Sequence, residues 1–331
     1  MSGSPGSTTS PRVAALCGGI GGAKLALGLY RVLGPDELMV IVNTGDDFEH
    51  LGLHVSPDLD TVLYTLSGRA DPQRGWGRAD ETWNFMTAVS ELAGEDWFRL
   101  GDRDLAIHVL RTQALKAGRP LSCFMADASQ CLGIRARIVP MSDDPVRTMV
   151  DTTEGVLPFQ RYFVERRCQP QVRGISFEGA SAARPAEEAL TALAGPQLEA
   201  ILICPSNPYL SIDPLLAVPG MREALVNTAA PVVAVSPIIG GAAVKGPTTT
   251  IMTDLGIERT SAAIAAHYRG LIDGLMIDEA DAAEVSTLDI AVETAPTLMR
   301  DLNDREILAR RALAFAHSLA SMQAGPRRVR A

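Results

Sequence analysis

The sequence predicts an α/β protein of the Rossmann-like class, in which a mostly parallel sheet carries helices on both faces. Short runs that are apolar throughout recur along the chain, and such runs are typical of strands buried on both faces. Segments with a helical spacing of apolar residues separate these runs. In addition, a glycine-rich segment directly follows the first run and opens a helix, as at phosphate-binding turns of this class.

The first strand-helix-strand unit lies near the N-terminus. Residues 12–17 (RVAALC) form an apolar run, GGIGGAK follows, and LALGLYRVLG continues as a helix. Residues 38–42 (LMVIV) predict the second strand. Ser56 and Pro57 then predict the start of the next helix, because Ser favours the N-cap and Pro the first helical position.

An inserted section of about residues 69–180 interrupts this order, with helical patterns first and short strands later. The short strands are expected at residues 134–141, 147–155 and 160–167. Buried strands then return at residues 200–204, 231–235 and 275–277. We therefore expect one Rossmann-like domain over residues 12–331, preceded by a disordered lead at 1–11 that is rich in Ser, Gly and Pro.

The composition excludes several classes of function. Lys and Arg number 30 and Asp and Glu 39, a net charge of −9, and only 5% of residues are aromatic. Both values argue against a protein that holds nucleic acid by charge or by stacking. The five cysteines form no C-x-x-C pair, which predicts neither a disulfide framework nor a zinc site and favours a reducing cytoplasm. Since no apolar stretch reaches the roughly 18 residues of a membrane span, we expect no membrane contact.

The segment GGIGGAK is the first candidate site for an anionic ligand. Its spacing differs from that of a P-loop, yet glycines let the backbone approach a phosphate, and the following helix points N–H groups at it. The alternative is that the glycines only allow tight packing. The candidate phosphate-binding residues are Gly18, Gly19, Gly21, Gly22 and Lys24.

Carboxylates form the second candidate site. Asp46 and Asp47 follow the second predicted strand, and Asp58 and Asp60 lie in the first turn of the next helix. Acidic residues there often only complement the helix dipole. Carboxylates that converge beside a phosphate site instead suit Mg²⁺, which takes one or two carboxylates plus phosphate oxygens.

Two later turns, PSNP and SPIIGG, each follow a buried strand. Ser206, Asn207 and Ser236 in them offer hydroxyl and amide groups to a nucleotide, although turn formation alone also explains these residues. Lys245 is a second candidate phosphate cation. His108 lies on a predicted helix and is interpreted as a hydrogen-bonded structural histidine rather than a base.

Five motifs, in one order, resemble the 2-phospho-L-lactate transferase family of coenzyme F-420 biosynthesis. They are VNTGDDFEHLGLHVSPDLDTVLYTLSG, GDRDLAIHVLR, PMSDDPVRTMV, PSNPYLSI and AVSPIIGGAAVKGP. The resemblance implies a Mg²⁺-dependent transferase that is commonly a homodimer. It implies transfer of a phospho-organic-acid group, derived from lactate, enolpyruvate or glycerate, out of a guanosine diphospho donor. The acceptor is then the terminal ribityl hydroxyl of the deazaflavin Fo (7,8-didemethyl-8-hydroxy-5-deazariboflavin), and GMP is released.

The same resemblance assigns roles to residues. It implies that Asp46, Asp58 and Asp60 are catalytic and that Asp46 and Asp58 hold the metal. Contact with Fo is implied for Asp60, Arg99, Trp83 and Asn84. Contact with the donor is implied for Gly18, Gly19, Gly21, Gly22, Lys24, Ser206, Asn207, Pro208, Ser236 and Lys245. The general base stays unassigned.

Two other classes of function are compatible with parts of the sequence. A regulator that senses nucleotides or nucleotide sugars on a related fold would share the glycine segment and an Asp pair, but the motifs SPDLDTVLY and GDRD favour the enzyme. An NAD-dependent oxidoreductase would fit the first strand-glycine-helix unit, but no set of His, Tyr or Lys suited to hydride transfer follows. The sequence does not select among the three donor acids.

Overall fold

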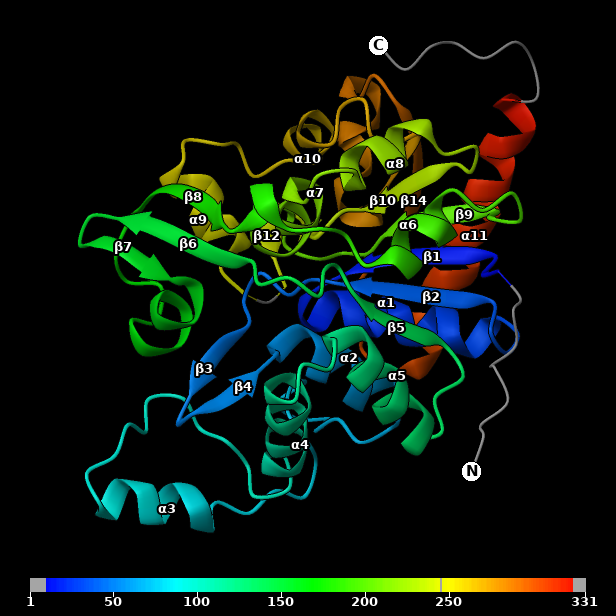
Figure 1. Ribbon diagram of the computed structural model, residues 1–331. Coiled ribbons are helices and arrows are strands. Elements are labelled where there is room, and N and C mark those ends of the chain that lie inside the picture. Colours follow the sequence, from blue (N-terminus) through cyan, green and yellow to red (C-terminus); the bar gives the residue numbers. More distant parts are fainter. Residues whose placement is uncertain (1–9, 245, 324–331) are drawn as a thin grey trace, which may run out of the picture.

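A seven-stranded parallel sheet organises the chain (Figure 1), whose computed structural model describes residues 10–244 and 246–323. The strand order is β14-β13-β10-β9-β1-β2-β5, and every neighbouring pair runs parallel. The Rossmann-like α/β class is therefore confirmed. The strands are β1 (Val13–Cys17), β2 (Leu38–Val42), β5 (Arg137–Pro140), β9 (Ala200–Ile203), β10 (Val232–Val235), β13 (Gly274–Asp278) and β14 (Ala291–Ala295).

Helices cover both faces of this sheet because its strands are apolar on both faces. In β1, Ala14 and Leu16 face one hydrophobic core, whereas Ala15 and Cys17 face the other. The first core is covered by α6 (Glu187–Leu193), α7 (Asp213–Ala217), α8 (Met221–Asn227), α9 (Thr248–Asp254) and α10 (Ser261–His267). The second core is covered by α1 (Gly19–Val32), α2 (Pro57–Leu66), α5 (Leu121–Cys131) and α11 (Leu302–Gln323).

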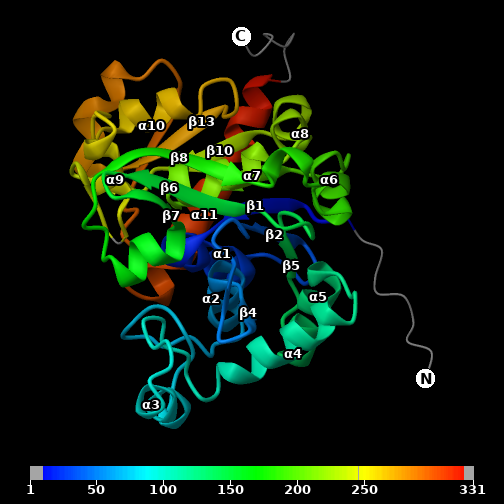
Figure 2. The same cartoon turned by 60° about the vertical axis from the view of Figure 1, so that its left-hand side comes forward.

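The inserted section contributes two helices away from the sheet, α3 (Asn84–Glu91) and α4 (Leu105–Lys116). Both views place α3 at the far end of the molecule, and Met86 is its one buried residue (Figures 1 and 2). Helix α4 instead packs against the hairpin strand β4 (Leu53–Val55) and against α5. The insertion thus has an outer part with little packing and an inner part that contacts the sheet domain.

Three small antiparallel sheets complete the fold. The hairpin β3 (Phe48–His50) and β4 (Leu53–Val55) leads directly into α2. Strands β6 (Arg147–Thr152), β7 (Gly155–Pro158) and β8 (Val172–Glu178) form a second sheet, and β11 (Ile238–Ile239) with β12 (Ala242–Ala243) forms a third. Strands β3, β4, β7, β11 and β12 are two to four residues long, which is too few positions for a period to show. The seven-residue β8 was not predicted either, whereas β6 lies within the expected strand at 147–155.

The structure corrects one predicted strand and relocates another. Residues 160–167 do not form a strand, because Arg161–Glu165 is a turn of π-helix with Tyr162 buried. The strand expected at 134–141 exists as β5, but it pairs with β2 in the main sheet although it lies within the inserted range. Of the expected lead at 1–11, residues 1–9 lie outside the described residues.

Helix length and polarity bear on the expectation of no membrane contact. Within residues 10–244 and 246–323, none of the helices combines the length and apolarity that crossing a bilayer requires.

Candidate active site

A cavity of about 770 Å³ opens at the carboxyl edge of the main sheet. Its wall includes residues 18–21 after β1, Asp46 beyond the end of β2, residues 205–207 after β9 and Ser236 after β10. Open α/β sheets bind ligands at this edge, where neighbouring strands lead into separate loops. The structure thus brings together the glycine segment, the acidic residues and both later turns that the sequence singled out.

The glycine segment packs closely on the turn after β9. A Cβ on Gly21 would lie 2.4 Å from the carbonyl oxygen of Pro205, and one on Gly22 would lie 2.5 Å from Ser206 Oγ. Tight packing therefore requires these two glycines, and Gly22 does not line the cavity. Gly19 differs, because it has a φ of +64° and nothing lies within 4 Å of its Cβ position. Since α1 begins there, its N-terminus faces open space in the cavity.

The turn after β9 presents one unused donor to the cavity. The hydroxyl of Ser206 accepts the Gly18 N–H at 3.1 Å and donates to the Gly18 carbonyl at 2.8 Å, so it holds the fold together. Asn207 Oδ1 accepts the backbone N–H groups of Tyr209 and Leu210 at 3.0 and 3.2 Å. This fixes the amide and leaves its buried Nδ2 without a partner among the described residues. Asn207 lines the cavity, so a bound ligand can accept this hydrogen bond.

Asp46 and Asp58 face the cavity side by side. The Nδ2 group of Asn43 donates to Asp46 Oδ1 and to Asp58 Oδ2, both at 3.0 Å. Asp58 also accepts the Gly19 N–H at 2.6 Å, and Gln160 Nε2 donates to Asp46 Oδ2 at 3.2 Å. One asparagine on the loop after β2 therefore couples the two carboxylates.

Burial and neighbouring carboxylates raise the pKa values of both Asp46 and Asp58. Burial first, and then the charges of Asp58 and Asp47, raise the pKa of Asp46 well above its usual value. Burial also raises the pKa of Asp58 to about 6, although hydrogen bonds from Asn43 and Gly19 oppose that rise. A cation would stabilise two buried carboxylates of this kind. Two carboxylates with phosphate oxygens make a donor set that fits Mg²⁺. Nowhere in the described ranges do three or more His, Cys, Asp or Glu side chains form a metal site by themselves.

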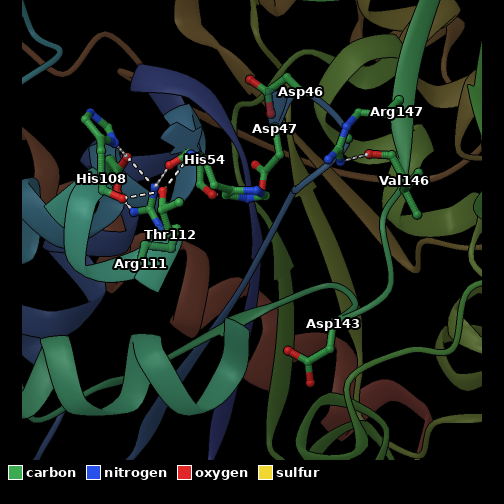
Figure 3. Close-up of polar contacts among 12 residues, drawn as sticks. Asp46, Asp47, His54, His108, Arg111, Thr112, Asp143, Val146 and Arg147 are labelled. Carbon is green, nitrogen blue, oxygen red and sulfur yellow. Dashed lines mark hydrogen bonds and ion pairs between the residues drawn. The ribbon is translucent and has the colours of Figure 1, made fainter. Parts of the chain in front are cut away.

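Asp60 is held from the inserted section. Arg111 on α4 forms a two-pronged ion pair with it, one contact being Nη1 to Oδ2 at 3.1 Å. His108 places Nδ1 3.8 Å from Asp60 and Nε2 3.2 Å from Asp104. His108 is buried beside these two carboxylates and also lines the cavity, so its role as a structural histidine stays a prediction (Figure 3). Sequence reasoning missed Arg111, since an arginine on a helix gives no sign of its distant partner.

The residues expected to contact Fo separate into two groups. Arg99 and Asp60 line the cavity, whereas Trp83 and Asn84 do not. Trp83 stacks under the Arg99 guanidinium at 4.6 Å from its ring centre, and the Asn84 side chain donates to Asp102 at 2.9 Å. The Phe, Trp and Tyr residues that do line the cavity are Tyr64, Trp76, Trp97, Phe98, Phe159 and Phe163. These six residues are scattered in sequence, so no local pattern predicted them.

The remaining candidates occupy the cavity wall, lie behind it or fall outside the description. Lys24 lines the cavity and donates from Nζ to the Met299 carbonyl at 2.7 Å. Ser236 lines it too, with its Oγ accepting the Ile238 N–H at 3.2 Å. Pro208 does not line the cavity, because it begins the π-helical turn Pro208–Ile212. Lys245 lies outside the described residues.

A family match decides what kind of protein has this site. Residues 13–314 match the family model described as 2-phospho-L-lactate transferase CofD. The chain belongs to this family. It is therefore an enzyme, a transferase of phospho groups in coenzyme F-420 biosynthesis.

Curated relatives agree over nearly the full length of the enzyme. A phosphoenolpyruvate transferase from Kitasatospora aureofaciens is 44% identical over 322 residues, covering 93% of this chain and 98% of that protein. A protein of the same name from Streptomyces coelicolor is 41% identical, covering 93% and 99%. The phosphoenolpyruvate transferase of Mycobacterium tuberculosis is 40% identical, covering 88% and 95%.

Solved structures support the fold of the enzyme. The crystal structure of BH3568 from Bacillus halodurans, a member of the UPF0052 family, superposes with a TM-score of 0.62. The alignment covers 93% of this chain and all of that chain at 16% sequence identity. Identity this low shows a shared architecture alone.

Proposed function

We propose that the enzyme transfers a phosphoenolpyruvyl group from a guanosine diphospho donor to the terminal ribityl hydroxyl of Fo, with release of GMP. The observation that carries this proposal is the cavity itself, whose wall carries both polar and aromatic side chains. We assign the polar end of the ligand site to the N-terminus of α1 with Asp46 and Asp58, and the aromatic end to Trp97 and Phe159 among others. The shared name of the curated relatives supports enolpyruvate over lactate or glycerate.

The polar end suits the diphosphate of the donor. The N–H groups of Gly18 and Gly19 are bonded by Ser206 and Asp58, so what favours an anion in the open space beside Gly19 is the dipole of α1. Asn207 Nδ2 is a fixed donor in the same cavity, and Lys24 adds a positive charge on its wall. These groups would hold the guanosine diphospho moiety of the donor by its phosphate oxygens.

The aromatic end suits the ring system of Fo. Flat aromatic side chains bury and stack a conjugated ring, which a polar wall would not do. Arg99 stands beside them on the cavity wall and offers a guanidinium to the ring's polar edge. This arrangement would direct the ribityl chain toward the acids at the polar end.

The reaction then needs positioning and charge neutralisation rather than a covalent enzyme intermediate. The ribityl oxygen forms a bond to the phosphorus that carries the organic acid, while the bond from this phosphorus to the bridging oxygen breaks and GMP leaves. The hydroxyl proton passes to a carboxylate of the acidic cluster, for which hydrogen-bond reach is the requirement. Mg²⁺, held by Asp46 and Asp58, would supply the positive charge that neutralises the diphosphate.

The proposal is tested by incubating the enzyme with Fo, Mg²⁺ and each of the three guanosine-activated acids. The expected result is GMP release and a phosphodiester product mass with the enolpyruvyl donor. Removing Mg²⁺ with a chelator is expected to stop the release, and adding it back to restore it, because the two carboxylates alone leave the diphosphate charge unbalanced.

Two outcomes would change the proposal. Faster turnover with the lactyl or glyceryl donor would keep the transfer and replace the acid. If the folded protein releases no GMP from any donor, and binds a nucleotide while ignoring Fo, the proposed transfer to Fo is overturned and the alternative of nucleotide sensing is favoured.

A further inference from the structure

Helix α4 of the inserted section touches the acidic segment of the active site at two consecutive residues, Arg111 and Thr112 (Figure 3). The segment they contact runs from the loop after β2, through the hairpin β3–β4, to the first turn of α2. It carries Asp46, Asp58 and Asp60. Helix α4 therefore contacts the segment that carries every acid assigned to the reaction.

Arg111 is buried completely, with an exposed fraction of 0%. Both of its Nη atoms bond the Asp60 carboxylate, and Nη1 lies 3.4 Å from the His54 carbonyl oxygen. The ring of Phe124 packs 5.6 Å from the guanidinium carbon. A planar guanidinium with two bonds to one carboxylate fixes the rotation of that carboxylate, which a lysine ammonium cannot do.

Thr112 forms a second contact between α4 and the hairpin. Its hydroxyl oxygen accepts the His54 N–H at 2.8 Å and donates to the His108 carbonyl at 2.6 Å. The His54 N–H therefore donates to Thr112, and the His54 carbonyl is contacted by Arg111. Two side chains of α4 thus bind the backbone of one residue of β4.

His54 connects the hairpin to the loop after β2. Its Nε2 lies 3.1 Å from Asp47 Oδ2, which also accepts the Ser56 hydroxyl at 2.7 Å. Asp47 directly follows Asp46 in the chain. The orientation of the loop that presents Asp46 thus depends on where α4 holds His54.

We propose that Arg111 and Thr112 are positioning residues of the active site, Arg111 for the Asp60 carboxylate and Thr112, through His54 and Asp47, for the loop of Asp46. The role in turnover rests on the proposed function. The insertion is then part of the catalytic architecture, since its inner helix sets the geometry of acids that belong to the sheet domain.

Arg111→Lys and Arg111→Met test the first part. Each variant is expected to lose about 100-fold in kcat, because a displacement near 1 Å at a reacting group costs that much. Affinity for GDP, measured by calorimetry, is expected to stay within about twofold, since the donor contacts lie on other elements. Arg119→Met is the matched control, because Arg119 forms an exposed ion pair with Asp127 at 2.6 Å and lies away from the cavity.

Thr112→Val and Thr112→Ser test the second part without relying on turnover. Valine keeps the shape and removes the acceptor of the His54 N–H, whereas serine keeps the hydroxyl. Hydrogen exchange of the His54 amide is expected to accelerate about tenfold in the valine variant, in line with the loss of one hydrogen bond, and to return toward the wild-type rate in the serine variant.

The outcomes separate this inference from the proposed function. A folded Arg111→Lys enzyme with wild-type kcat, or a valine variant with unchanged His54 exchange, overturns the corresponding part. If Arg111→Met fails to fold, the Arg111→Lys and Thr112→Val variants still test the two parts of the inference. If the wild-type enzyme releases no GMP, the proposed function has failed, and the exchange experiment continues to test the positioning of the hairpin.

Discussion

Replacing Asp58 by asparagine is expected to lower kcat on the order of 10³-fold, as loss of a central charge-stabilising group does in other enzymes. Asparagine keeps an oxygen for the Gly19 N–H that Asp58 accepts at 2.6 Å, so the start of α1 should stay in place. What is lost is the negative charge that would hold Mg²⁺ beside the diphosphate. Steady-state GMP release at saturating Mg²⁺ measures the effect, with Asp127→Asn as a surface control.

The same variant is expected to lose the part of the pH dependence of stability that Asp58 contributes in the absence of metal, while its absolute stability also reflects the lost acceptor for Asn43 Nδ2. The pKa of Asp58 is raised to about 6 in the folded state, above the roughly 3.9 of an unfolded chain. Folding therefore disfavours the ionised form, and the resulting loss of stability builds up as the pH rises from about 4 to about 6. Above that window the asparagine variant avoids this cost. Activity within about tenfold of wild type would contradict the assignment of Asp58 to a metal site. An unfolding free energy that falls as steeply between about pH 4 and about pH 6 as in the wild type would contradict the raised pKa of Asp58.

Replacing Gly21 by alanine is expected to destabilise the enzyme by about 3 kcal/mol, the upper end for forcing a methyl group into a packed site. The added Cβ would lie 2.4 Å from the carbonyl oxygen of Pro205, and backbone on both sides leaves little room to adjust. Urea unfolding at equilibrium measures the free-energy difference. Because α1 would shift away from the turn after β9, donor affinity is expected to fall as well.

Gly19→Ala is the matched control for this effect. Its Cβ would meet nothing within 4 Å, so the cost is the left-handed backbone alone, about 1–2 kcal/mol. Gly21→Ala should therefore be clearly the more damaging of the two substitutions. Equal stabilities of the two variants would show that close packing on Pro205 is not what requires Gly21.

Sequence patterns located the acids and the glycines because each sits at a local structural signal. Asp46 follows a buried strand and Asp58 follows a Ser-Pro helix start, and strand ends of a parallel sheet meet at one edge. The fold class was predicted from the alternation of buried apolar strands with helical segments. What these patterns could not show is how far each side chain reaches, and Trp83 and Asn84, which were expected to contact Fo, lie outside the lining of the cavity.

The contacts that the sequence did not reveal all cross between elements far apart in the chain. Arg111 reaches Asp60 over 51 positions, and Gln160 reaches Asp46 over 114. Nothing in the local spacing of either residue marks its partner. The aromatic lining has the same origin, because Trp97 and Phe159 belong to separate parts of the inserted section and line one cavity only in the folded chain.

The central claim is that the cavity at the carboxyl edge of the sheet binds the guanosine diphospho donor together with a divalent metal. A crystal structure with GDP and Mn²⁺ tests it most directly, because the anomalous signal of Mn²⁺ places the ion without ambiguity. We expect the ion to contact Asp46 and Asp58 and a phosphate of GDP to lie at the N-terminus of α1. A nucleotide bound outside this cavity, or an ion held by other residues, would contradict the claim.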